Sequence, residues 1–455
     1  MLKRIKETGD IFFAVSDRDW VLNGANVHIS MVGFDDGSET SRQLDGAGVS
    51  QIHSNLTAQA GDTTLAQRLP SMADTVFMGD TKGGAFDIDD DTAQSWLLAP
   101  NPNGKPNSDV LVPWANGLAV TRRMDPMWII DFGREDQANA SGYKAPFAHV
   151  QQHVLPERKE NKREAYAKYW WRHAEARPAM LAALAPLPRF LATVAVAKHS
   201  LFVWLKQPVL PDHALFAYAN SQDCFFGVLQ SRVHLLWALK QGTRLETRPR
   251  YTPTTCFETF PFPFALKEPL PQGESTPQSE IDAAHHYFMA KEDAAPYGEA
   301  SHRAAIAAAA NSLNDLRERW LNPSEWTHTV TLEFSGSVGG PWARFIDSTT
   351  VEAKTGVGTV RYPRLKPRDA KAAAELKKRT LTGLYNERPP WLDHAHRKLD
   401  AAVAAAYGWP ADLSDEQILE RLLALNLRRA AAESAATTKP KSRKSQREKT
   451  ADELL

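Results

Sequence analysis

The chain has 455 residues, of which 43% are hydrophobic, and it carries 54 cationic and 54 anionic side chains. This length is enough for two or three domains, each with its own core. The zero net charge excludes a histone-like coat of positive charge, but a local basic face would still suffice to contact phosphates.

The cysteine content and the lack of long apolar runs indicate in which cellular compartment the protein lies. Cys224 and Cys256 are the only cysteines, too few for a disulfide scaffold, and we expect them to be reduced, buried thiols. No apolar run approaches the ~20 residues that span a bilayer. The patch Ile11–Val15 follows Asp10 and is too short for a signal peptide. These features predict a cytoplasmic protein without a membrane partner.

The N-terminal segment, residues 1–60, begins with two β-rich runs. Ile11–Val15 and Val27–Phe34 are separated by a stretch that contains the turn-forming pair Asn23-Gly24. We expect them to be the closing strands of a sheet whose other strands lie elsewhere.

Residues 61–265 alternate short strands and turns. A helix is predicted over 157–177, and strands over Phe190–Ala197 and Leu201–Leu205. A further helix over Phe225–Leu239 should end at Gly242. We predict an α/β domain with mixed, mostly antiparallel strands.

The composition changes after Phe264. Residues 266–280 are rich in Pro, Gln and Glu and are typical of a linker. Residues 281–432 should be mainly helical, although 327–362 contain β-like runs. Ser414 and Gln417 are spaced as a capping box. The basic tail 433–455 should be disordered.

Enzyme motifs of several common classes are absent. The chain contains no HExxH, GxSxG or GxxxxGK[ST] sequence. The acidic residues at 87 and 89–91 are interpreted as a solvated loop. The pairs His285-His286 and His394-x-His396 lack complementary ligands elsewhere, so we expect no metal site.

The segment 158–177 carries the strongest nucleic-acid signal, because cations are interleaved with aromatic residues there. Cations at this density can neutralise several phosphates, and planar rings can pack on sugars or bases. The alternative is an amphipathic helix with a solvated basic face and aromatic core anchors. Two further groups are the turn Lys198-His199 and the arginines near residues 232–250. The candidate DNA-binding residues are Arg158, Lys159, Lys162, Arg163, Tyr169, Trp170, Lys198, His199, Arg232, Arg244 and Arg250.

Three segments resemble the MmeI-like, type IIG-related adenine-specific DNA methyltransferases. Residues 4–37 resemble the last strands of that family's methyltransferase domain. Residues 79–263, ending in CFETFPFP, resemble its target recognition domain, and residues 376–430 resemble its helical C-terminal region. The resemblance implies recognition of double-stranded DNA for adenine-N6 methylation, in restriction–modification or phage defence, with S-adenosylmethionine as the methyl donor of the complete enzyme.

The family's chemical motifs are missing from this chain. Adenine methylation needs a Gly-rich cofactor loop and an Asn-Pro-Pro-aromatic motif that holds the flipped base. Asn101-Pro102 and Asn322-Pro323 are the only Asn-Pro pairs, and neither continues with Pro and an aromatic residue. We therefore assign no catalytic residue and no cofactor to this chain alone, and expect the catalytic domain upstream or on a partner subunit. The alternatives are a stand-alone DNA-binding protein and an active methyltransferase with an unrecognised cofactor site.

Overall fold

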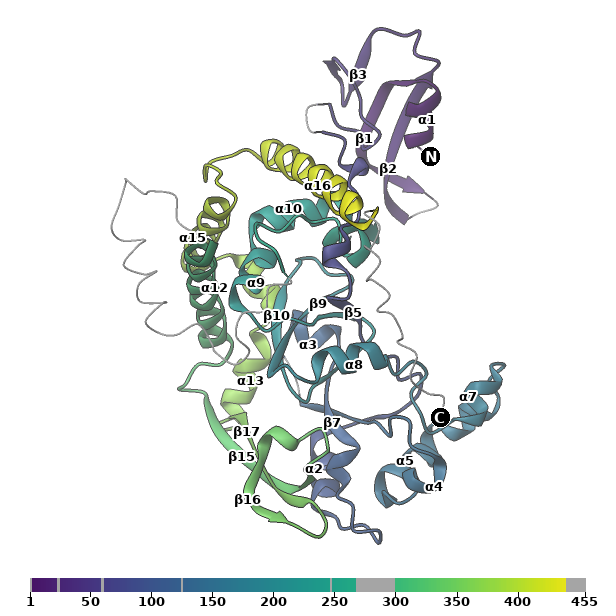
Figure 1. Cartoon of the computed structure of the whole chain (residues 1–455), viewed down its shortest axis with the longest axis vertical. Coiled ribbons are helices and arrows are strands. Elements are labelled where there is room, and N and C mark those ends of the chain that lie inside the picture. The colour runs from purple at the N-terminus through teal and green to yellow at the C-terminus, as the bar shows by residue number, and fades with distance from the viewer. Residues whose placement is uncertain are drawn as a thin grey trace, which may run out of the picture.

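The computed structural model describes residues 2–22, 25–58, 61–123, 126–245, 248–266 and 299–438. The body is elongated, with a small N-terminal sheet at one end and the sheet of β15–β17 at the other (Figure 1). None of the helices in these ranges is both long and apolar enough to cross a membrane.

The N-terminal sheet is a small unit with its own core. Strands β1 (Asp10–Leu22) and β2 (Ala25–Asp35) pair antiparallel, as predicted, and are longer than predicted; residues 23 and 24 lie outside the described ranges. The sheet order is β2-β1-β3-β4, with β3 at Arg42–Leu44 and β4 at Ala47–Val49. Helix α1 (Leu2–Thr8) precedes β1. The core of this unit consists of Ile11, Ala14, Ile52 and Leu56.

Two four-stranded sheets form the middle of the molecule, in the orders β10-β9-β12-β5 and β11-β7-β8-β6. Only β11 and β7 pair parallel within them, so the predicted mixed, mostly antiparallel architecture is confirmed. The predicted neighbours 190–197 and 201–205 are paired as β9 and β10. The strands are β5 (Val76–Met78), β6 (Asp87–Ile88), β7 (Leu111–Ala115), β8 (Met127–Ile130), β9 (Arg189–Val194), β10 (Phe202–Lys206), β11 (Leu210–Pro211) and β12 (Leu215–Tyr218).

The single helix predicted over 157–177 is wrong. The chain forms α6 (Leu155–Lys159) and α7 (Glu164–Lys168), separated by a turn in which the Asn161 side chain accepts a hydrogen bond from the Arg163 amide at 2.9 Å. Asparagine favours such local side-chain bonds over a continuous helix. After α7 the chain turns over residues 169–172, and Glu175 then pairs with Thr81.

The helix predicted over 225–239 is divided into two. Helices α9 (Asp223–Gln230) and α10 (Arg232–Gln241) are separated by Ser231, which is extended with ψ 156°. Gly242 ends α10, as predicted. A Cβ at this glycine would lie 2.7 Å from the carbonyl oxygen of Arg250, so the close approach of the next strand requires glycine.

The C-terminal region is mainly helical, as predicted, but it contains a three-stranded antiparallel sheet of order β15-β17-β16. Helix α12 (Glu299–Leu321) stops directly before Asn322-Pro323, and the predicted capping box forms between Ser414 and Gln417. The other elements are β15 (Thr327–Ser337), β16 (Ile346–Glu352), β17 (Val357–Pro367), α13 (Ala370–Lys378), α14 (Leu381–Glu387), α15 (Pro390–Ala406) and α16 (Asp415–Thr438).

At the two ends of the C-terminal region, the structure does not follow the predicted boundaries in full. Residues 267–298, with nearly all of the predicted linker, and residues 439–455 lie outside the described ranges. Residues 433–438, predicted to be disordered, continue α16. The reason is a tertiary contact, because the Glu433 carboxylate accepts hydrogen bonds from the amide and hydroxyl of Ser71 at 2.8 and 2.7 Å.

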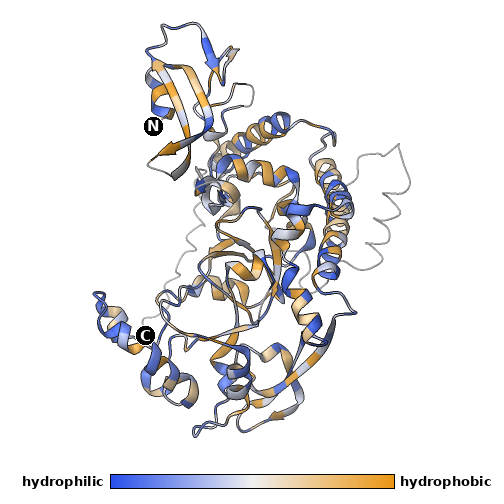
Figure 2. Cartoon of the chain, turned by 180° about the vertical axis from the view of Figure 1, so that it is seen from behind, coloured by the Kyte–Doolittle hydropathy of each residue, from blue (hydrophilic) through white to orange (hydrophobic). Residues whose placement is uncertain are grey.

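The C-terminal elements share their cores with the middle sheets. One cluster joins the sheet of β9, β10 and β12 to α9, α10, α12, α15 and α16. A second joins β7 and β8 to the sheet of β15–β17 through Trp342, whose indole nitrogen donates to the carbonyl of Leu111 at 2.9 Å. Apolar residues accordingly lie on the strands and helices inside the body (Figure 2). Cys224 and Cys256 are both buried free thiols, as predicted.

The acidic run 87–91 is not the solvated loop that we expected. Asp89 caps helix α2 (Asp90–Leu98) by accepting the Thr92 amide at 2.8 Å. Asp90 forms two hydrogen bonds with the Arg364 guanidinium, at 2.6 and 3.0 Å, and accepts the indole N–H of Trp128 at 2.9 Å. This carboxylate therefore attaches β17 to the middle of the molecule.

Candidate nucleic-acid interface

Residues 137–172 form a projection that we call the arm. It contains α4 (Gln137–Ala140), α5 (Lys144–His153), α6 and α7. Figure 1 shows it extending from the lower part of the body, with α7 near its outer end. The arm carries most of the cations of the strongest sequence signal.

An exposed cationic surface, which we call the arm face, follows α6 and α7. It consists of Lys159, Lys162, Arg163, Lys168 and Tyr169, all exposed. The guanidinium of Arg163 donates to the Tyr166 hydroxyl at 2.9 Å, and the amine of Lys168 lies 5.4 Å from the ring centre of Tyr169. Cation–π contacts of this kind restrain the rings while the charges stay in water. This surface can contact phosphates without further rearrangement.

Two predicted members of this surface are buried, so they are removed from the candidate contacts. Arg158 is 3% exposed, and its guanidinium donates to the carbonyls of Lys82 at 3.0 Å and Gly83 at 3.1 Å. Burial lowers its pKa. Trp170 is 7% exposed and lies 5.3 Å from the ring of Phe147. Both side chains face the core of the arm rather than the solvent.

The turn at Lys198 and the arginine hairpin are brought together by the fold. Strands β13 (Thr243–Leu245) and β14 (Arg248–Arg250) form a hairpin, and Val196 forms a β-bridge with Arg250. Lys198 and the predicted hairpin contacts Arg244 and Arg250 are exposed, as is Arg248. We call these four residues the hairpin face. Arg244 also lies 3.4 Å from Asp17 of β1, so this face adjoins the N-terminal sheet.

His199 and Arg232 line a cavity of about 280 Å³ beside Lys198. His199 is half-buried, and its Nε2 lies 3.0 Å from the Asn386 side-chain oxygen. The guanidinium of Arg232 pairs with Asp415 and donates to the Leu413 carbonyl at 3.1 Å. Arg232 therefore connects α10 to the C-terminal helices.

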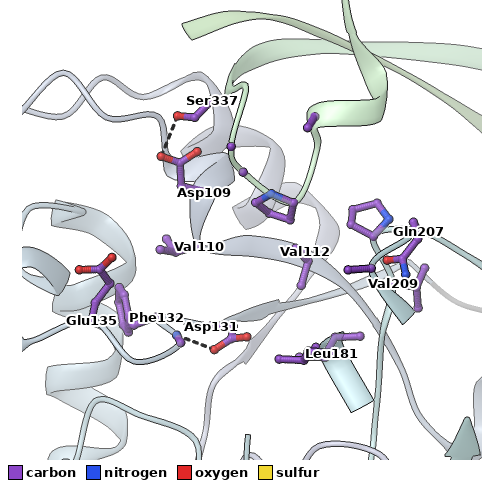
Figure 3. Close-up of a pocket in the computed structure, with 18 of the residues that line it drawn as sticks. Asp109, Val110, Val112, Asp131, Phe132, Glu135, Leu181, Gln207, Val209 and Ser337 are labelled. Carbon is purple, nitrogen blue, oxygen red and sulfur yellow. Dashed lines mark hydrogen bonds between the residues drawn. The ribbon is translucent and has the colours of Figure 1, made fainter. Parts of the chain in front are cut away.

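A second cavity, of about 710 Å³, lies between β7, the base of the arm and the segment after β15 (Figure 3). Asp109, Asp131 and Glu135 line it, together with apolar residues such as Val110 and Val209. Asp109 accepts the Ser337 hydroxyl at 2.9 Å, and burial raises the pKa of its carboxyl. Lys105, Arg134 and Arg344 line the same cavity, so its charges are mixed, and it is not one of the two exposed basic surfaces.

Over the described parts of the chain, no three His, Cys, Asp or Glu side chains are placed to hold a metal ion together. His396 of the predicted pair 394/396 is buried, and its Nε2 lies 2.8 Å from the Tyr385 hydroxyl. Residues 285 and 286 lie outside the described ranges.

A comparison with known protein families finds a match in the middle of the chain. Residues 123–264 match the family model described as the target recognition domain of MmeI. That range contains both the arm face and the hairpin face, and all eleven candidate contacts. No curated protein matches this chain.

A solved structure of the type IIL restriction-modification enzyme MmeI in complex with DNA has the same fold. The TM-score is 0.60 at 16% sequence identity, and the match covers 94% of this chain and 47% of MmeI. The chain thus spans about half the length of that enzyme. The resemblance to the MmeI-like enzymes that the sequence indicated is confirmed.

Proposed function

We propose that this chain recognises a DNA sequence as part of a restriction–modification enzyme. The observation that carries the proposal is the match of residues 123–264 to a target recognition domain, because this range holds two exposed basic surfaces. The related MmeI structure contains DNA. Both surfaces have the chemistry that duplex DNA requires.

The two surfaces suit different parts of the duplex. The arm face presents long cations beside an exposed tyrosine, which suits phosphates and sugars. The hairpin face presents three arginines on a two-stranded ribbon, an element that the major groove can admit, and arginine can donate two hydrogen bonds to a guanine edge. We therefore assign positioning on the backbone to the arm face and base contacts to the hairpin face.

We further propose that the reaction served is S-adenosylmethionine-dependent methylation of adenine N6 in the cytoplasm, with the catalytic domain supplied by another polypeptide or another part of the same one. Strand β2 supports this, because it lies at the edge of its sheet and no described strand pairs with its outer side. Trp20, Val21 and Leu22 at the end of β1 are exposed apolar residues. An open edge beside apolar side chains favours pairing with another domain.

The arm face is tested by the salt dependence of duplex binding. The variant Lys159→Gln/Lys162→Gln/Arg163→Gln removes three exposed charges and leaves the described core untouched. Its slope of log affinity against log salt should be less steep by ~0.9 for each phosphate that the variant no longer neutralises, so by up to about 2.7. Fluorescence anisotropy over a salt series measures both quantities.

A charge-matched control separates this effect from net charge. Lys354, Lys371 and Lys377 are exposed lysines of the C-terminal region, outside the recognition match. The variant Lys354→Gln/Lys371→Gln/Lys377→Gln should keep the wild-type slope. Equal slopes for the wild type and the arm-face variant would contradict phosphate binding by the arm.

The proposal of a separate catalytic domain has its own test. The purified chain alone should transfer no methyl group from labelled S-adenosylmethionine to DNA, because it lacks the cofactor loop and the amine-holding motif. Addition of a cognate methyltransferase domain, such as the product of an adjacent reading frame, should restore transfer. Methylation by the chain alone would disprove the proposed division of labour.

A further inference from the structure

The arm meets the body through a small set of buried polar residues: Asp80, Arg158 and His173. Arg158 directly precedes the first lysine of the arm face, and His173 directly follows the arm. All three side chains are buried, and Asp80 and His173 are fully inaccessible. Buried charged groups are costly unless they are paired, so their position at this junction calls for an explanation.

We infer that Asp80, Arg158 and His173 form an anchor that positions the arm face for DNA. They are positioning residues, because none of them can reach a ligand from the core. The inference rests on the proposed DNA binding by the arm and adds how the structure holds that surface in place.

Arg158 joins three separate segments. Its Nε donates to the Gly83 carbonyl at 3.1 Å, and its Nη2 lies 3.0 Å from the Lys82 carbonyl and 3.4 Å from the Arg172 carbonyl. The guanidinium also stacks 4.7 Å from the ring centre of Tyr166 in α7. One side chain thereby fixes α6, α7 and the end of the arm against the loop that precedes β6.

The ion pair between His173 and Asp80 fixes the end of the arm. The His173 Nδ1 lies 2.8 Å from an Asp80 carboxylate oxygen, which is an ion-pair distance without hydrogen-bond geometry, and its Nε2 lies 2.9 Å from the Ile130 carbonyl. Burial alone would lower the pKa of His173, but the nearby carboxylates of Asp131 and Asp80 outweigh it and raise that pKa. A protonated His173 is attracted to the Asp80 carboxylate by its charge and can donate a hydrogen bond from Nε2 to the Ile130 carbonyl.

Backbone contacts lie directly beside the pair. Thr81 and Glu175 exchange two hydrogen bonds of 3.1 Å, directly beside Asp80 and two residues after His173. Gly83 has φ +62°, and a Cβ there would lie 2.7 Å from the Cβ of Ala174. A side chain at residue 83 would therefore push the end of the arm away from the loop.

The experiment compares the salt slope of duplex binding among anchor variants. Asp80→Asn leaves His173 with only the more distant carboxylate of Asp131, at 3.9 Å, and His173→Gln leaves the buried Asp80 carboxylate without the imidazole beside it. Each variant should lower the slope toward that of the arm-face triple variant. The double variant Asp80→Asn/His173→Gln replaces the ion pair by two neutral amides that can bond to each other, and it should recover at least half of the difference in slope. Addition of the arm-face triple variant to Asp80→Asn should flatten the slope little further.

The matched control is Asp223→Asn. It breaks another buried ion pair, in which the Arg189 guanidinium donates to Asp223 at 2.7 Å, in a part of the molecule that does not touch the arm. This variant should keep the wild-type slope. If Asp80→Asn does not fold, Gly83→Ala disturbs the same junction through a different residue and carries the same expectation.

Three results separate the possible failures. A wild-type slope in a folded Asp80→Asn or Gly83→Ala protein would overturn the anchor. So would an equally flattened slope in Asp223→Asn, because the effect would then be general destabilisation. An unchanged slope in the arm-face triple variant would instead overturn the proposed binding of DNA by the arm.

Discussion

Asn426 of α16 forms a reciprocal pair of hydrogen bonds with the backbone of Gln67. Its side-chain oxygen accepts the Gln67 amide at 2.9 Å, and its nitrogen donates to the Gln67 carbonyl at 2.7 Å and to the Thr259 carbonyl at 2.7 Å. Asn426 is fully buried. The C-terminal helix is therefore part of the fold that carries the recognition surfaces, rather than an appended domain.

Asn426→Leu should strongly destabilise the protein. The substitution leaves the buried carbonyl of Thr259 and the part-buried amide and carbonyl of Gln67 without this partner, and a buried group left unpaired costs ~1–3 kcal/mol. We expect the free energy of unfolding to fall by about 1–3 kcal/mol, measured by urea denaturation. The control Gln151→Leu changes an exposed amide on α5 and should stay within ~0.5 kcal/mol. Similar decreases in both variants would contradict the structural role of Asn426.

Local rules predicted the elements whose hydrogen bonds are local. The hairpin β1–β2, the pairing of β9 with β10 and the stop of α10 at Gly242 depend on residues near one another in the sequence. The same holds for the capping box, where the amides of Ser414 and Gln417 each bond to the other's side chain. Such patterns can be read from the sequence because the partners lie within a few positions.

The features that could not be predicted depend on contacts between residues that are far apart in the sequence. The ion pair of Asp90 with Arg364 joins residues 274 positions apart, so the partner of this carboxylate could not be predicted, although the Asp89 cap that starts α2 is local. Arg158 and Lys159 are adjacent and chemically alike in the sequence, yet one is buried and the other exposed. The exposed members of the arm face could therefore be proposed from the sequence, but the anchor could not.

The N-terminal unit should be removable only as a whole. Its core residues Ile52 and Leu56 lie beyond the hairpin, so deletion of residues 1–36 would expose them together with β3 and β4. Deletion of residues 1–60 removes the complete unit and the open edge of β2. We expect the longer deletion to be monomeric, with DNA binding largely retained, and the shorter one to aggregate.

Size-exclusion chromatography and thermal unfolding of the two deletions check this prediction. The main cores of the molecule do not include residues 1–60, so the longer deletion should unfold cooperatively near the wild-type temperature. Non-cooperative unfolding would show that the N-terminal sheet supports the recognition fold. A soluble, monomeric protein after the shorter deletion would show that β3 and β4 need no hairpin.

The buried carboxyl of Asp400 should make stability depend on pH. It accepts the amide of Arg232 at 2.7 Å beside the cavity at His199, and burial raises its pKa to about 6. The unfolded value is ~3.9. Between about pH 4 and pH 6 the folded protein keeps a proton that the unfolded chain has released, so the contribution of this group to stability falls as the pH rises.

Asp400→Asn removes this titration and retains an acceptor for the Arg232 amide. We expect the free energy of unfolding of the variant, relative to the wild type, to rise between pH 4 and pH 6 by up to ~3 kcal/mol, since one pKa unit corresponds to ~1.36 kcal/mol. Urea denaturation at several pH values measures the difference. The exposed Asp412→Asn provides the charge-matched control and should follow the wild-type curve. Parallel curves for the wild type and Asp400→Asn would mean that Asp400 is ionised in the folded protein throughout this range.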